Sequence, residues 1–290
     1  MPQLQIIDIF PPFLDFWQET RHKPLAVQLD EWAAIYMAPW SELLNKQLDD
    51  YAELEVDWRI IAAEHVFPYL DQRLPAMKSI HSQLPDICAA AHNHAQEKLG
   101  LNCDLVTLFY VGIGCGAGWV TTYEDKPAIL FGLENIAEEG WMKSSTLGGF
   151  VAHELGHVAH FHWREQANLA DGSGAWWQLY TEGFAQWVEH LLLGRPTWHM
   201  QDEQKKDWLG WCQENRSWLA AEFIRSVNTD ESTRPFFGSW YDIQGYKQTG
   251  YFLGHELIQL LAADYSLHEI ALIDDLAIIT QTLETLNSDA

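Results

Sequence analysis

Basic residues are scarce in this sequence. It has 17 Lys and Arg against 41 Asp and Glu, which gives a formal net charge of -24 at pH 7 over 290 residues. A surface of that sign repels the phosphates of nucleic acids and the headgroups of anionic lipids. We therefore expect no nucleic-acid partner and no membrane partner, whereas the charge says almost nothing about the fold.

Cysteines and long apolar runs are also few. Cys88, Cys103, Cys115 and Cys212 are scattered without a C-x-x-C pair, which is typical of reduced thiols rather than a disulfide framework. The N-terminal residues contain acids and prolines where a signal peptide has a basic start and an apolar core. The longest apolar stretch, residues 105–120, contains four glycines and is shorter than the roughly 20 residues of a membrane helix. We expect a cytoplasmic protein.

The first hundred residues have helical periodicity. Residues 29–51 and 76–100 both carry apolar side chains at three- and four-residue spacing, with Pro39 and Pro85 predicted to kink or break these helices. Gly100 and Asn102 are typical helix-ending residues. A chain of this length suits one large domain or two lobes.

The pattern changes to that of strands after Asp104. Residues 104–111, 118–123 and 127–133 are rich in β-branched and aromatic side chains, and helical periodicity returns from about Ser144. This order predicts an α+β, mostly α-helical fold with one small sheet. We expect a helical N-terminal region, residues 1–103, and a second domain, residues 104–290, which together form one compact unit around a cleft.

A run of alternating glycines, Gly112 to Gly118, resembles part of a dinucleotide fingerprint. The segment TTYEDKP follows it where that fingerprint has a helix, so we expect no dinucleotide cofactor. The run can instead lie at a strand edge that pairs with an extended peptide.

The residues with the clearest chemistry are His153-Glu154-Leu155-Gly156-His157, an H-E-x-x-H motif. Positions i and i+4 of a helix lie on one face. His153 and His157 can therefore both bind one zinc ion, at the usual zinc–nitrogen distance of about 2.0–2.1 Å. Glu154 is placed to reach a water on that metal and to act as its general base.

Chance is the simplest alternative explanation of this motif. About one chain in twenty of this composition would contain H-E-x-x-H by chance, and two buried, hydrogen-bonded histidines would look the same. The motif lies within an otherwise apolar helical stretch, residues 145–160, where two histidines and a glutamate are costly to bury. We therefore interpret it as a metal site.

An open catalytic zinc site needs a third protein ligand. The extended motif H-E-x-x-H-x-x-G-x-x-H is excluded, because its last two defined positions hold His160 and Trp163. Glu182 fits the other common solution, a glutamate on a later helix, and the adjacent Gly183 is expected to let that helix pack closely against the motif helix. Glu189, two turns further along, can instead be the ligand or a partner of one.

HELGH followed by TEGFA resembles the gluzincin metallopeptidases. Within them the chain is similar to the oligopeptidases related to thimet oligopeptidase, which carry a histidine at the position of His160, and to predicted bacterial zinc proteases of unknown function. The resemblance covers roughly residues 105–262 and includes FYVGIGCGAGWV and LFGLENIA. It implies a zincin-like core with a small β-sheet beside the HExxH helix, a Zn2+ cofactor and a peptide substrate.

A peptidase also needs a donor to stabilise the oxyanion formed from the scissile carbonyl. Tyr251 and His255 are candidates, because they lie at i and i+4 of an otherwise apolar helix. The segment GYFLGH resembles the G-Y-x-x-G-Y element of the oligopeptidases, with His255 in place of the second tyrosine. Tyr246 is a further candidate, and Tyr251 can alternatively be a core aromatic.

Together these features predict a zinc-dependent peptidase that hydrolyses peptide bonds by a metal-activated water. In this hypothesis His153, His157 and Glu182 hold the metal, Glu154 is the general base, and Tyr251 and His255 polarise the carbonyl. One alternative is a catalytically weak, zinc-stabilised peptide-binding or regulatory protein, and another is an enzyme that hydrolyses a non-peptide amide. The sequence does not indicate an oligomeric state.

Overall fold

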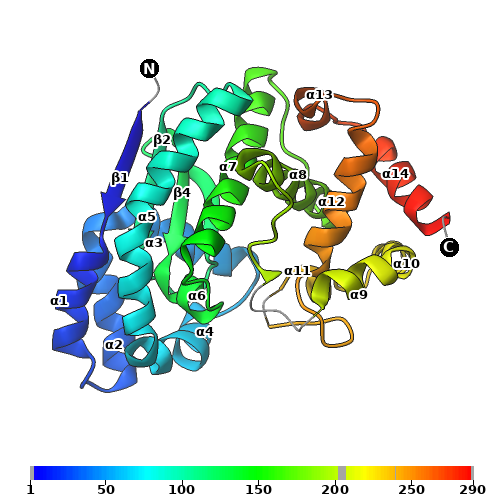
Figure 1. The fold of residues 1–290 in the computed structure, drawn as a ribbon. Helices are drawn as coiled ribbons and strands as arrows, with labels where there is room; N and C mark the ends of the chain where they lie inside the picture. The colour runs from blue at the N-terminus through cyan, green and yellow to red at the C-terminus, as the bar shows by residue number, and fades with distance from the viewer. Residues whose placement is uncertain (1–2, 202–206, 239, 289–290) are drawn as a thin grey trace. The chain divides into compact units, whose positions relative to one another are not determined.

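The computed structural model describes residues 3–201, 207–238 and 240–288, which belong to two compact units (Figure 1). Unit 1 comprises Met1–Ala90 and Asn102–Leu147, and unit 2 comprises Ala91–Leu101 and Gly148–Ala290. Unit 1 thus contains segments of both regions that the sequence suggested, residues 1–103 and residues 104–290. The chain is mostly helical and has one four-stranded mixed sheet, so the predicted α+β class is confirmed.

The sheet lies in unit 1 and has the strand order β1-β2-β4-β3. Its strands are β1 (Leu4–Asp8), β2 (Leu105–Tyr110), β3 (Gly118–Tyr123) and β4 (Lys126–Gly132). Strands β1 and β4 are parallel to β2, and β3 is antiparallel to β4. The three predicted strands are confirmed. Strand β1 was not predicted, because it lies in the region that we expected to be helical.

Strands β3 and β4 form a hairpin that shows how the local sequence sets the register. Tyr123 pairs with Lys126, and the two residues between them, Glu124 and Asp125, have φ of 50° and 59°. Positive φ at both central residues is typical of the type I′ turn, whose twist matches that of the paired strands. Strand β2 lies between two neighbours and is buried along its whole length, in keeping with its continuous apolar sequence.

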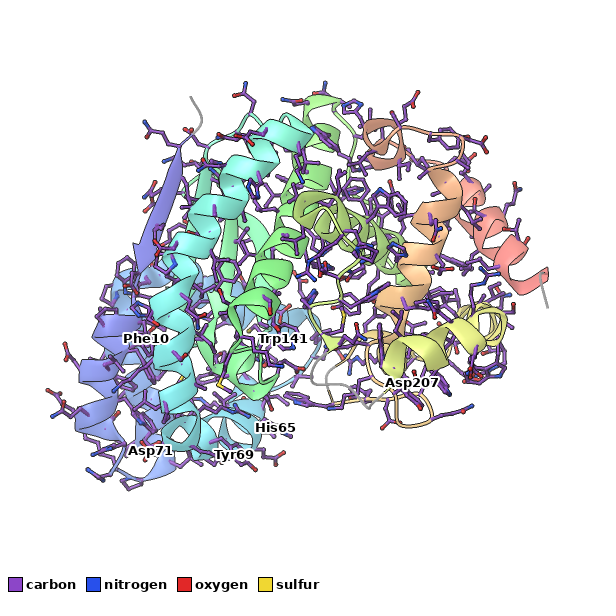
Figure 2. All side chains as sticks on the ribbon, in the orientation of Figure 1. Phe10, His65, Tyr69, Asp71, Trp141 and Asp207 are labelled. Carbon is purple, nitrogen blue, oxygen red and sulfur yellow. The ribbon has the colours of Figure 1, made fainter. Side chains whose placement is uncertain are left out.

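The helices of unit 1 include several short segments. In chain order they are α1 (Phe10–Thr20), α2 (Leu25–Glu31), η1 (Trp32–Tyr36), η2 (Ala38–Trp40), α3 (Ser41–Glu53), α4 (Trp58–Ile61), η3 (Ala62–Val66), η4 (Phe67–Tyr69) and α6 (Leu133–Glu138). Pro39 lies in η2, so the predicted break is confirmed. Phe10 begins α1 (Figure 2). Its ring stacks on that of Phe13, and both rings are buried.

Helix α5 (Leu70–Leu99) is the longest helix of the chain that the structure describes. It continues through Pro75 and Pro85, so Pro85 does not break it. Gly100 follows with φ of 65°, a left-handed conformation that commonly ends a helix, as the sequence predicted.

Unit 2 is built from helices. These are α7 (Ser144–Gln166, in this unit from Gly148), α8 (Ala175–Leu193), α9 (Trp208–Glu214), α10 (Arg216–Asn228), α11 (Arg234–Phe237), α12 (Thr249–Leu261), α13 (Leu267–Ala271) and α14 (Leu276–Ser288). Helix α12 packs along α8, and α14 packs on α10 and α12 (Figure 1). Within the described residues, no helix is both long and apolar enough to cross a membrane.

Two close helix contacts in unit 2 depend on glycine. A Cβ built on Gly183 of α8 would lie 2.1 Å from the carbonyl oxygen of Gly254 on α12. A Cβ on Gly156 of α7 would lie 2.7 Å from Cα of Ala185 on α8. The prediction that Gly183 lets α8 pack against the motif helix α7 was therefore wrong, because Gly183 faces α12. The close approach of α7 to α8 depends instead on Gly156.

Candidate metal centre

Helix α7 places the two histidines of the H-E-x-x-H motif side by side. Their Nε2 atoms are 3.2 Å apart, and the side chain of His153 is buried. They come together because one helical turn separates them on the same face. Leu155 points into the apolar core, where it is buried, and Gly156 lets α8 pack directly on this part of α7.

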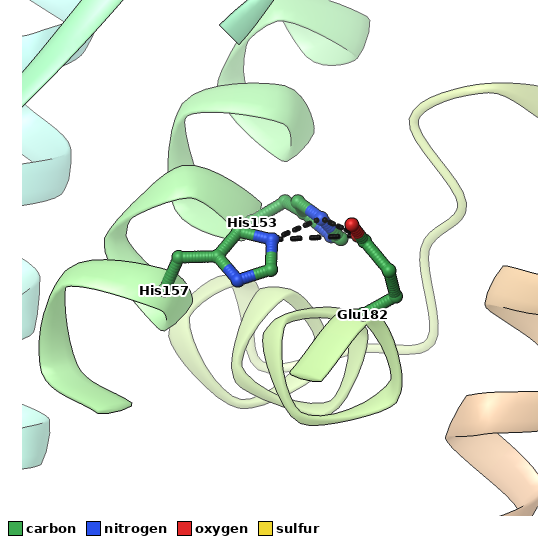
Figure 3. A group of neighbouring side chains, drawn as sticks. All are labelled: His153, His157 and Glu182. Carbon is green, nitrogen blue, oxygen red and sulfur yellow. Dashed lines mark hydrogen bonds and ion pairs between the residues drawn. The ribbon is translucent and has the colours of Figure 1, made fainter. Parts of the chain in front are cut away.

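Helix α8 brings Glu182 to the same two nitrogen atoms (Figure 3). Glu182 Oε2 lies 3.1 Å from Nε2 of His153 and 3.4 Å from Nε2 of His157. Ligand atoms about 2.05 Å from a zinc ion at tetrahedral angles lie roughly 3.3–3.4 Å apart. The three atoms lie close enough together to bind a single metal ion, and their spacing is compatible with tetrahedral zinc.

The charges of this cluster favour metal-binding protonation states. Burial lowers the pKa of His153 to about 4, so this imidazole is neutral at pH 7. Burial alone would raise the pKa of Glu182, but His157 and His153 outweigh it and hold that pKa well below its usual range. Metals bind neutral imidazole and ionised carboxylate. His157 is the group on which a metal would compete with a proton, because the Glu182 carboxylate outweighs burial and raises its pKa.

Glu154 lies beside the ligands on α7 and is buried. Desolvation raises the pKa of its carboxyl group to about 7, although His157 opposes the shift. A general base works best when its pKa lies near the working pH, because it is then partly ionised and still basic enough to take a proton. Glu154 therefore has the environment that its predicted role requires.

Glu189 and His199 form a second group of possible metal ligands with His153. The sequence pointed to Glu189 but not to His199. Glu189 is fully buried on α8; it lies 2.7 Å from Nδ1 of His199 and accepts a hydrogen bond from the His199 backbone amide. Potential ligand atoms of His153, Glu189 and His199 all lie within 4.8 Å of one another. Glu189 is therefore paired with His199, while Glu182 contacts both motif histidines.

Tyr251 and His255 lie on α12 but face different surroundings. The Tyr251 ring is 5.5 Å from the His153 ring and 6.3 Å from the His199 ring. His255 instead contacts the rings of His190 and Trp198, at 4.5 and 5.1 Å. The structure thus brings Tyr251 to the metal-ligand cluster and does not bring His255 there.

His160 and Tyr246 pack against other aromatic rings. His160 is buried among the rings of Trp177, Tyr180 and Phe184, and burial lowers its pKa to about 3. It is therefore a neutral core histidine. Tyr246 stacks on Trp211 with their centroids 4.1 Å apart.

Comparison of the chain with known protein families, with curated proteins and with solved structures finds no match. We therefore infer the function from the chain's own residues and their geometry.

Proposed function

We propose that the protein is a zinc-dependent peptidase with a zincin-like core, and that its metal centre lies in unit 2. The observation that supports this most strongly is the spacing of three ligand atoms, from His153, His157 and Glu182, at 3.1 to 3.4 Å beside a buried carboxyl group whose pKa is about 7. The donor set, two imidazoles and one carboxylate, is one of those that open catalytic zinc sites use.

A zinc ion held there would supply Lewis-acid chemistry by lowering the pKa of a bound water to near neutrality. In the proposed mechanism Glu154 takes a proton from the attacking water and returns one to the leaving amine. Tyr251 hydrogen-bonds the oxygen of the reacting carbonyl as negative charge develops on it. Burial of Glu154 and His153 excludes bulk water and strengthens each of these interactions.

A catalytically weak, zinc-stabilised peptide-binding protein is the second candidate. The position of His199 favours it, because its ring lies 5.0 Å from that of His153 and it belongs to a second group of possible ligands. Structural zinc sites are closed by four protein ligands. A histidine that closed the site in this way would leave no position for a water.

The variant Glu154→Gln separates the two candidates. Gln keeps the shape of the side chain but cannot accept the proton, so we expect peptide hydrolysis to fall by two to four orders of magnitude while zinc remains bound. Glu165→Gln is the matched control, because Glu165 is an exposed residue of the same helix. Unchanged hydrolysis in Glu154→Gln would overturn the mechanism, and zinc binding without hydrolysis in the unmodified chain would favour the second candidate.

The cellular setting of this activity is also a proposal. Within the described residues, which include all four cysteines, no disulfide joins them. Reduced thiols persist in the cytosol and are oxidised in secreted proteins. We therefore propose a cytoplasmic peptide substrate.

A further inference from the structure

A pocket of about 600 Å³ opens in unit 2 and is separate from the metal-ligand cluster. Helix α8 contributes Trp187 and His190, and α12 contributes Phe252, His255 and Glu256. Residues 194–198, which follow α8, add Arg195 and Trp198. The volume suits a small organic molecule. None of the metal-ligand cluster residues lines this pocket.

Aromatic rings form much of the pocket wall. The His255 ring lies 5.3 Å from that of Trp187, 5.1 Å from that of Trp198 and 4.5 Å from that of His190. Such a wall favours a flat apolar group, because aromatic rings bury a large area and pair edge to face or offset-stacked. An aromatic ligand can pack against such a wall.

The His190 side chain of the wall is neutral near pH 7. Burial, reinforced by the neighbouring His255, lowers the pKa of His190 to about 4. Its Nε2 lies 2.5 Å from the carbonyl oxygen of Thr197; because a carbonyl can only accept, the nitrogen donates. This bond ties α8 to the segment that carries Trp198 and fixes the aromatic wall.

Among the described residues that line the pocket, the acidic and basic side chains other than histidine are Glu256 and Arg195. Glu256 is paired, since its Oε2 lies 3.4 Å from Nη1 of Arg216 and its Oε1 lies 3.5 Å from Nδ1 of His255. Arg195 is exposed and makes no ion pair with any residue in the part of the chain that the structure describes. Arg195 is thus available to pair with an anion bound in the pocket.

We propose that this pocket binds an aromatic carboxylate. The aromatic group lies against the wall of Trp187, Trp198 and His255, and the carboxylate pairs with the Arg195 guanidinium, whose planar fork matches two carboxylate oxygens. Two sources have this chemistry: a free aromatic acid, and the C-terminus of a peptide that ends in an aromatic residue. The site does not depend on metal binding or hydrolysis.

Isothermal titration calorimetry of the full chain with three matched probes tests the proposal. The probes are 3-phenylpropionate, 3-phenylpropionamide and 3-phenylpropylamine, which share one aromatic group and differ in charge. We expect the carboxylate to bind about two- to fivefold more tightly than the amide, because a charge-assisted hydrogen bond is stronger than a neutral one but solvent screens a pair formed at an exposed arginine. We expect the amine to bind more weakly than both.

The variant Arg195→Gln assigns the binding to the pocket. We expect it to reduce the affinity of the carboxylate to that of the amide and to leave the amide unchanged. Arg234→Gln is the control, since Arg234 is also exposed and has no ion pair among the described residues, but does not line the pocket. Equal binding of all three probes, no binding at millimolar concentration, or full carboxylate affinity in Arg195→Gln would each overturn the proposal. Carboxylate binding that persists in Arg195→Gln would place the carboxylate at another site, such as on the metal.

The source of the carboxylate is decided with the peptide Gly-Gly-Phe, used as the free acid and as the C-terminal amide. Competition by the acid alone against 3-phenylpropionate supports recognition of peptide C-termini. Failure of both peptides to compete supports a free aromatic acid. Competition by both forms would show that the carboxylate is not recognised, which contradicts the role of Arg195.

Discussion

Gly183 and Gly254 bring two helices of unit 2 into backbone contact. The built Cβ of Gly183 would lie 2.1 Å from the carbonyl oxygen of Gly254, and the built Cβ of Gly254 would lie 2.8 Å from Cα of Gly183. Glu182 precedes Gly183 on α8, and Tyr251 lies one turn before Gly254 on α12. The contact therefore sets the separation between a proposed metal ligand and the proposed carbonyl donor.

Gly183→Ala is expected to destabilise the protein, because the added methyl group has no room beside rigid backbone. Overpacking of this kind costs about 1–3 kcal/mol of unfolding free energy. Gly148→Ala is the control, since its Cβ would meet nothing within 4 Å and alanine favours a helix by about 1 kcal/mol over glycine. Urea unfolding of both variants checks this. Equal stability of the two variants would show that the helices adjust freely.

Glu134 makes the stability of unit 1 depend on pH. It is buried, and desolvation raises its pKa from 4.5 to about 7, although the backbone amides of Gly112 and Gly114 oppose the shift. Between these two pH values the folded state keeps a proton that the unfolded state loses. The free energy of unfolding therefore falls as pH rises from about 4.5 to about 7, by on the order of 2–4 kcal/mol for this group.

The variant Glu134→Gln removes this titration. Compared with the unmodified chain, its stability should rise between pH 5 and pH 7.5, because Gln stays neutral throughout. The difference between the two proteins in urea unfolding isolates the contribution of Glu134 from those of other groups. A difference that stays constant over this range would contradict a raised pKa.

Arg164 is expected to contribute more to the stability of the folded protein than its number of ion pairs suggests. It is buried, donates to the carbonyl oxygens of Ala271 and Ile273 and lies 4.6 Å over the Trp177 ring. Arg164→Met would leave these carbonyls without their donor, and each such loss costs about 1–3 kcal/mol. Thermal unfolding measures the change.

Arg225 provides the contrast for Arg164. It forms short ion pairs with Glu222 and Glu231, both at 2.6 Å, but all three groups lie at the surface. Solvent screens such pairs, so Arg225→Met should change the unfolding temperature much less than Arg164→Met. A larger effect at Arg225 would mean that burial is not what makes Arg164 important.

The sequence predicted the local features of this protein better than the distant ones. Strands β2, β3 and β4 were recognisable because β-branched and aromatic residues alternate with clear turn signals. Strand β1 was missed, because it is short and its pairing with β2 joins Leu4 to Leu105, a contact that no local pattern encodes. Leu4, Ile6 and Ile7 alone do not distinguish a strand from the start of a helix.

In the candidate site, too, residues related by local spacing were predicted better than residues brought together by distant contacts. His153 and His157 were predictable from helical spacing, and Glu182 was chosen from its context on an apolar helix. His199 was missed, because it follows α8 in a loop and reaches Glu189 only through the return of the chain. His255 was expected beside Tyr251 from their shared helix face, but the wall of Trp187, His190 and Trp198 surrounds it instead.

Metal content per chain tests the central proposal most directly. The protein is purified without added metal, then offered zinc and dialysed, and compared with His157→Ala by atomic emission. Our account predicts one zinc per chain and its loss in the variant, because three ligand atoms hold the ion and two do not. No zinc in the unmodified chain, or equal zinc in both proteins, would contradict a metal centre at His153, His157 and Glu182.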